Sequence, residues 1–157
     1  MGRDDVAGAT GVAFTSAGVA AVVGVVLVGQ RYVGPGRLRL TLLIGTGTSA
    51  GLYLILAAAD STVMFIGTFA GLAFVQATMV PAANALIAAN VPRDRRGTGF
   101  GIASSAQALS FLCGPTAAAA FAATSLRLGF VVLAGVLLAL CAMLFTTLRE
   151  PRSQEAS

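Results

Sequence analysis

Histidine, lysine and tryptophan are absent from this sequence, and only 10% of its residues carry a charge. An ordinary soluble domain has about 25% charged residues, so water is not the main solvent for this chain. The two cysteines, Cys113 and Cys141, lie in apolar runs without metal-ligand spacing, and no histidine can complete a zinc site. We therefore interpret both cysteines as packing residues and predict neither a metal nor a disulfide.

Signatures of enzymatic chemistry are also missing. The sequence has no phosphate-binding glycine loop, no nucleophile elbow and no paired carboxylates. We expect no enzyme activity, no cofactor and no nucleic acid partner. The lipid bilayer is the first partner that the composition indicates, because 57% of the residues are hydrophobic and they occur in long runs.

Charged residues divide the chain into five apolar segments. A helix of about 20 residues crosses a hydrocarbon core of roughly 30 Å, and each segment is long enough to do so. The sequence therefore predicts an all-α membrane protein with a five-span transmembrane region over residues 1–148 and a cytoplasmic tail over 149–157. The predicted spans are 6–29, 38–59, 62–91, 98–124 and 128–148.

Arginine is distributed unequally between the loops. Eight of the ten arginines lie in two loops and the tail, and basic residues in short loops favour the cytoplasmic side of the inner membrane. We expect the loops at Arg37 and Arg95 and the C-terminus inside, and the turn at Asp60 and the N-terminus outside. An exported N-terminus without a signal sequence, ahead of an odd number of spans, favours a truncated chain. A genuine five-span protein is the alternative.

Small residues and prolines interrupt the spans. Small residues four positions apart let helices approach closely, although glycine is frequent in membrane helices in any case. Pro81 and Pro115 each remove a backbone donor and are expected to kink the third and fourth spans, either structurally or as gating hinges. The spaced pairs are Gly47 with Gly51, Gly67 with Gly71, and Gly114 with Ala118.

Uncharged polar side chains occur at depth in the third and fourth spans. Gln76 lies near the middle of the third span, and Asn84 lies closer to its cytoplasmic end. Gln107 lies near the middle of the fourth span, on one face with Ser104 and Phe111. A side-chain amide in hydrocarbon needs a hydrogen-bonding partner, so both glutamines are predicted to point into the bundle. They either contact a small-molecule substrate or hydrogen-bond a neighbouring helix.

Charged side chains are absent from the interior of all five predicted spans. Transport that is coupled to protons or ions normally requires an ionisable group within the membrane, so this chain cannot carry the coupling alone. The same absence argues against a small four-span drug exporter that works as a dimer.

Taken in order, residues 6–148 resemble the C-terminal half of a major facilitator superfamily transporter, most like its drug and small-molecule exporters. The strongest match is PAANALIAANVP at 81–92, followed by Arg95 and Arg96, which is similar to the passage from a half's fourth helix into its fifth. Gly114 with Pro115 resembles the family's Gly-Pro pair in that fifth helix. A second loop resembles the family's cytoplasmic glycine and arginine loop through Gly29, Arg31, Gly36 and Arg37.

This resemblance implies a partial six-helix half of a major facilitator bundle, in which the five spans are the eighth to twelfth helices. The seventh helix and the N-terminal half would be the missing partners, and substrate would bind between the halves during alternating access. We therefore expect a partial secondary transporter that exports small amphipathic molecules or drugs and is not competent alone. The alternative is a non-transporting membrane assembly or interaction protein, in which Gln76 and Gln107 serve packing only.

Overall fold

The computed structural model of the chain describes residues 3–29 and 37–147. Helices joined by short turns make up these residues, and no strand occurs among them. Five of the helices are long and apolar enough to cross a membrane, which confirms the predicted fold class. The elements are α1 (Arg3–Gly24), the π-helical η1 (Val25–Gly29), α3 (Leu38–Ala57), α4 (Thr62–Asn90), the 3-10 helix η2 (Arg93–Arg95), α5 (Arg96–Thr124) and α6 (Leu126–Thr147).

Serine side chains define the starts of two helices. Ser61 has an extended backbone before α4, and its Oγ accepts a hydrogen bond from the backbone N–H of Met64 at 3.2 Å. This is an N-cap, which satisfies one of the donors that a helix start leaves unpaired. Ser125 does the same before α6, where its Oγ accepts from the N–H of Leu128 at 3.4 Å. Because of these caps, α3 with α4 and α5 with α6 form hairpins with very short turns.

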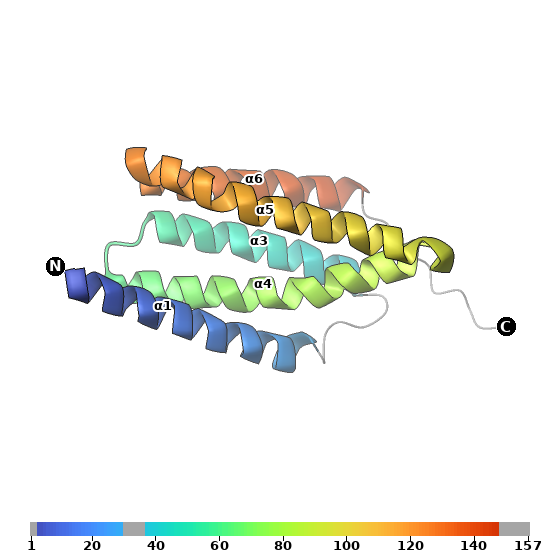
Figure 1. Cartoon of the computed structure of the whole chain (residues 1–157), viewed down its shortest axis with the longest axis horizontal. Coiled ribbons are helices and arrows are strands. Elements are labelled where there is room, and N and C mark those ends of the chain that lie inside the picture. Colours follow the sequence, from blue (N-terminus) through green and yellow to red (C-terminus); the bar gives the residue numbers. More distant parts are fainter. Residues whose placement is uncertain (1–2, 30–36, 148–157) are drawn as a thin grey trace.

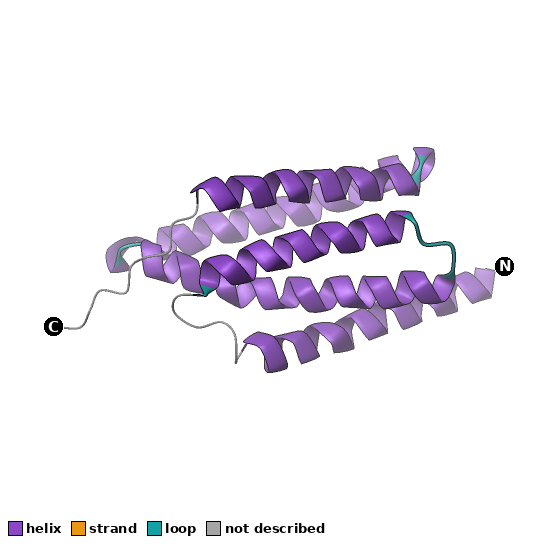
Figure 2. Cartoon of the chain, turned by 180° about the vertical axis from the view of Figure 1, so that it is seen from behind, coloured by secondary structure: helices purple, strands orange, loops and turns teal. Residues whose placement is uncertain are grey.

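Four helices pack in a row, in the order α1, α4, α3 and α6 (Figure 1). Within the row, α4 packs against α1 on one side and α3 on the other, and α3 packs against α6. The view from behind in Figure 2 shows the same order. The fifth helix, α5, crosses one face of the row and has much sparser contacts, mainly with α6 and α4.

Close backbone approach holds α1 against α4. A Cβ added at Gly24 would lie 2.8 Å from the backbone oxygen of Phe74, which is closer than real Cβ atoms come. Only glycine allows the two helices to approach at this point. Between α3 and α4 the contact is instead made by a buried apolar cluster of Leu38, Leu42 and Ala82.

Aromatic side chains connect the four packed helices near the α3–α4 turn. Phe14 of α1 meets Phe69 of α4 edge to face, with ring centroids 5.7 Å apart, and Phe69 stacks on Phe65 at 6.2 Å. Phe65 reaches Phe130 of α6 at 6.4 Å, and Phe130 stacks with Tyr53 of α3 at 6.3 Å. Offset and edge-to-face pairs of this kind contribute about 0.5–1.5 kcal/mol each beyond the area they bury. Aromatic contacts therefore link all four helices of the row at this end.

An ion pair joins the two hairpin turns at the same end. The Nη2 of Arg127, at the start of α6, lies 2.7 Å from Oδ1 of Asp60, in the α3–α4 turn. Both side chains are largely exposed, so the pair adds little to stability but fixes one turn beside the other.

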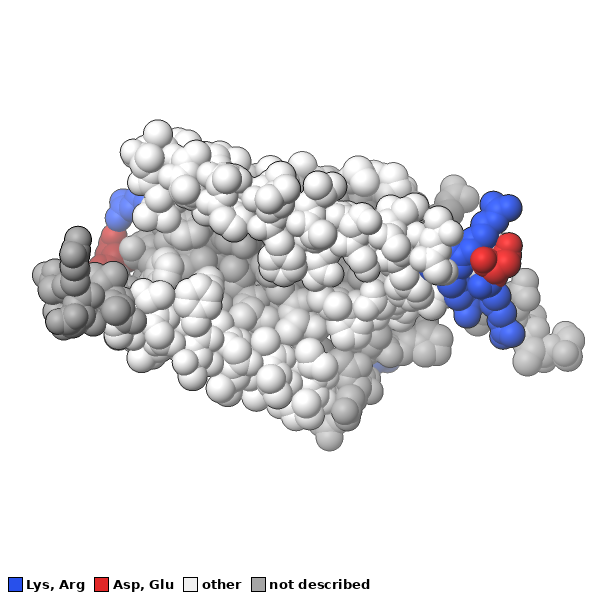
Figure 3. Space-filling model, viewed as in Figure 1, with Lys and Arg blue, Asp and Glu red and all other residues white. Residues whose placement is uncertain are grey.

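Charged side chains lie at the two ends of the bundle, and the face between them is uncharged (Figure 3). At one end are the residues of η2 and the start of α5, and at the other are Asp60 and Arg127. A membrane-spanning bundle requires this distribution, because charges in hydrocarbon are costly.

The helices that contain Pro81 and Pro115 continue through both residues. Figure 1 shows α4 bending before its C-terminal end, as expected where proline removes a backbone hydrogen bond. Whether either proline acts as a gating hinge stays a prediction.

Candidate functional site

The polar residues of α5 share one face of a helix that the rest of the chain leaves uncovered. Ser104, Gln107 and Phe111 are spaced three and four residues apart and therefore lie on the same side of the helix. All three are exposed, and 74% of the Phe111 surface is accessible. No residue of α5 is buried by the described parts of the chain.

The candidate residues of α4 are exposed as well. Gln76 and Asn84 both have accessible side chains, although they lie on the helix at the centre of the row. Among the described residues, no hydrogen bond joins Gln76 to Gln107. α5 approaches α4 near the connecting turn, where a Cβ added at Gly99 would be 3.3 Å from Cγ2 of Ile87. A common substrate site for the two glutamines therefore stays a prediction about a larger assembly.

Glycines with the four-residue spacing do not mediate the closest contacts within the described chain. A Cβ added at Gly67 or Gly114 would meet no described atom within 4 Å, and at Gly71 it would only reach Leu52 at 3.9 Å. Gly47 and Gly51 are equally open. Close approaches occur instead at Gly24 and at other single glycines, namely Gly45, Gly99 and Gly129. Gly47, Gly51, Gly67 and Gly114 therefore make no close helix contact within the described chain.

Basic residues gather at the membrane edge where α3 and α5 begin and α6 ends. Arg39 is held there, because its Nη2 donates to the backbone oxygen of Phe145 and its guanidinium lies 5.5 Å from the centre of that ring. Arg96 donates from Nε to the backbone oxygen of Val91 at 3.3 Å, and Arg95 lies 3.7 Å from its neighbour Asp94. Gly29 ends η1, and Arg31 and Gly36 lie outside the described residues.

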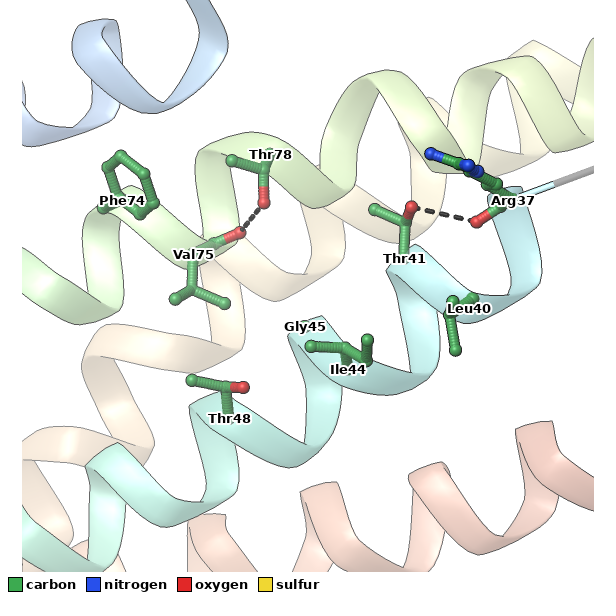
Figure 4. Close-up of a pocket in the computed structure, with 9 residues that line it drawn as sticks. All are labelled: Arg37, Leu40, Thr41, Ile44, Gly45, Thr48, Phe74, Val75 and Thr78. Carbon is green, nitrogen blue, oxygen red and sulfur yellow. Dashed lines mark hydrogen bonds between the residues drawn. The ribbon is translucent and has the colours of Figure 1, made fainter. Parts of the chain in front are cut away.

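A groove runs between α3 and α4 from the same edge toward the middle of the bundle (Figure 4). Its volume is about 490 Å³. One wall is a face of α3 and the other comes from α4, and Arg37 lies at the end where α3 begins. The lining residues are Arg37, Leu40, Thr41, Ile44, Gly45, Thr48, Phe74, Val75 and Thr78.

Two of the threonines in the groove direct their hydroxyl groups back to their own helices. Oγ1 of Thr41 donates to the backbone oxygen of Arg37 at 2.9 Å, and Oγ1 of Thr78 donates to that of Val75 at 2.7 Å. Because both hydroxyls bond to the backbone, these threonines present their methyl groups to the groove. The groove is apolar along its length and positively charged at one end. Sequence reasoning identified Arg37 only as a loop residue and missed the groove. The sequence did contain a signal for it, because the spacing places four of the lining residues on one helical face: Arg37, Thr41, Ile44 and Thr48.

Comparison with known proteins identifies a family. The sequence profile described as Major Facilitator Superfamily matches residues 3–157. No curated protein and no solved structure matches the chain. The profile covers all five membrane-length helices.

Proposed function

This chain belongs to the major facilitator superfamily, and we propose that it forms part of a secondary transporter that exports small amphipathic molecules or drugs by alternating access. The family is one of transporters, and the five membrane-length helices are those of a multi-pass membrane protein. In this proposal the chain supplies five helices of the second half and works only together with the remaining helices. Export is inferred from the likeness of residues 6–148, taken in order, to the drug and small-molecule exporters of the superfamily.

The observation that carries the proposal is the uncovered α5. Of the five candidate spans, α5 is the least hydrophobic, and no part of it is buried within the described chain. Its exposed face includes Gln107 and Ser104, at a depth where the bilayer would offer them no hydrogen-bonding partner. A helix with an exposed polar face in the membrane is expected to border other helices or a water-filled cavity. The missing helices of a transporter would supply both.

Coupling to an ion gradient is assigned to the part of the transporter outside this chain. The charged residues of the described helices lie at or next to helix ends, as Arg39, Arg96 and Arg127 do. An antiporter needs an ionisable group at depth, so the other half would contribute it.

Orientation follows from the positions of the arginines. We place the loops at Arg37 and Arg95 and the C-terminus in the cytoplasm, and the Asp60 turn and the N-terminus outside the inner membrane. Alkaline phosphatase fused at Asp60 should be active and fused at Arg95 should be inactive. The reverse pattern would refute this orientation.

The function is tested by restoring the missing helices. The DNA upstream of Met1 is read first, because an in-frame transporter half there supports the proposal, and an independent promoter without such a half supports an assembly or interaction protein. In the restored transporter, Gln107→Leu should change the range or affinity of exported dyes without loss of insertion, because the bilayer accepts leucine more readily than an amide. Gln76→Leu should act in the same direction.

The control for this test is a conservative apolar substitution on α1, such as Val19→Leu, because Val19 is exposed and α1 contains no glutamine. If Gln76→Leu and Gln107→Leu both leave export of every dye unchanged, as the control does, the assignment of the substrate face is wrong. In that case the two glutamines do no more than hydrogen-bond between helices.

A further inference from the structure

We propose that the groove between α3 and α4 binds one anionic phospholipid, with the phosphate at Arg37 and an acyl chain along the groove. This binding site goes beyond the transport function and does not depend on it. Only the choice of leaflet, the cytoplasmic one, rests on the proposed orientation.

The charge at the mouth of the groove identifies the headgroup. In the described part of the chain the guanidinium of Arg37 has no hydrogen-bonded or ionic partner, whereas Arg39 is engaged by Phe145. Arg37 immediately precedes α3 and therefore lies where the membrane span begins. A guanidinium presents a fork of donors that matches a phosphate, and basic residues at this depth attract anionic lipids.

The length and chemistry of the groove identify the rest of the ligand. Residues 37 to 48 advance along a helix by roughly 16 Å at 1.5 Å per residue, about half of a hydrocarbon core of roughly 30 Å. The groove therefore extends over the depth of one leaflet, parallel to the helices. Its apolar walls come from Leu40, Ile44 and Phe74. The hydroxyl groups of Thr41 and Thr78 are already hydrogen-bonded to the backbone of their own helices. Apart from Arg37, the one hydroxyl in the lining that makes no hydrogen bond with the described residues is that of Thr48, at the deep end. An acyl chain fits such a lining, because it needs no polar partner.

The test measures lipid binding by the purified full chain in detergent, using native mass spectrometry. Phosphatidylglycerol should bind as a single tight equivalent, about fivefold more tightly than phosphatidylcholine, which is the factor that one basic residue near an anionic surface contributes. Arg37→Gln should remove this preference. Arg95→Gln is the matched control, because Arg95 is at the same end but does not line the groove, and the preference should survive.

A second pair of variants tests the acyl chain. Thr48→Phe fills the deep end of the groove and should weaken the binding of both lipids, whereas Thr116→Phe, on the exposed α5, should weaken the binding of neither. Circular dichroism of all four variants identifies any that fail to fold. If Thr48→Phe does not fold, Leu40→Ala replaces it, because this change removes part of the groove wall without adding volume. Leu40→Ala should also weaken the binding of both lipids.

Three results would overturn the proposal. If Arg37→Gln and Arg95→Gln reduce the preference equally, the attraction is diffuse surface charge. If glycerol phosphate or inorganic phosphate displaces phosphatidylglycerol, the site binds a free anion. If the substitutions in the groove wall leave both lipids unaffected, no acyl chain occupies the groove.

Discussion

Helices α4 and α5 are alike in sequence terms and differ in what surrounds them. Both have 29 residues, one internal proline and a glutamine near the middle. α4 lies at the centre of the packed row, between α1 and α3, and buries Leu72, Thr78 and Ala82. α5 buries none of its residues. Length and composition therefore decide that a helix spans a membrane, but the neighbouring helices decide how much of its surface is buried.

The largest effect is expected from breaking the close contact of α4. Gly24→Ala should lower the free energy of unfolding by about 1–3 kcal/mol, because the added Cβ meets the backbone oxygen of Phe74, which cannot move aside. Detergent-solubilised protein unfolded by titration with sodium dodecyl sulfate, followed by circular dichroism, measures the change.

The matched substitution in α5 is Gly114→Ala. Its Cβ would meet no described atom within 4 Å, so the free energy of unfolding should stay constant or rise by up to about 1 kcal/mol from helix propensity. Equal losses in the two variants would show that α5 is packed as tightly as α4.

A smaller effect is expected from separating the two hairpin turns. Arg127→Gln removes the ion pair with Asp60, the direct link between the α3–α4 turn and the start of α6. Because both side chains are largely exposed, the loss should be less than about 1 kcal/mol and should disappear at high salt. The same unfolding titration at low and high salt checks this. A loss of several kcal/mol that salt does not change would mean that the pair is desolvated in the membrane-bound protein.

The sequence was sufficient for the helices because the signal for a membrane span is local. Asp60, Pro92 and Ser125 mark the turns that the structure shows, and the apolar runs between them are the helices. Bounds differ slightly for a local reason: the Ser125 cap starts α6 at Leu126, and not at the expected position 128.

Contacts between the helices could not be predicted from the sequence in the same way. The four-residue spacing favoured Gly67 and Gly114 as packing residues, yet the close approaches are at glycines outside the predicted pairs, such as Gly24. Which glycine meets a neighbour depends on how two distant helices cross, and spacing within one helix does not contain that information. The α3–α4 groove was missed for the same reason, since three of its nine lining residues, Phe74, Val75 and Thr78, come from another helix.

The central claim is that this chain is one part of a transporter and that its α5 face is completed by helices outside it. Efflux of a cationic amphipathic dye from cells that express the chain alone tests this claim most directly, with membrane insertion verified by blotting. We predict efflux equal to that of an empty-vector control, because the described spans have no charged group at depth for coupling and, as proposed, the half that faces α5 lies outside this chain. Efflux above the control that an uncoupler abolishes would contradict the account.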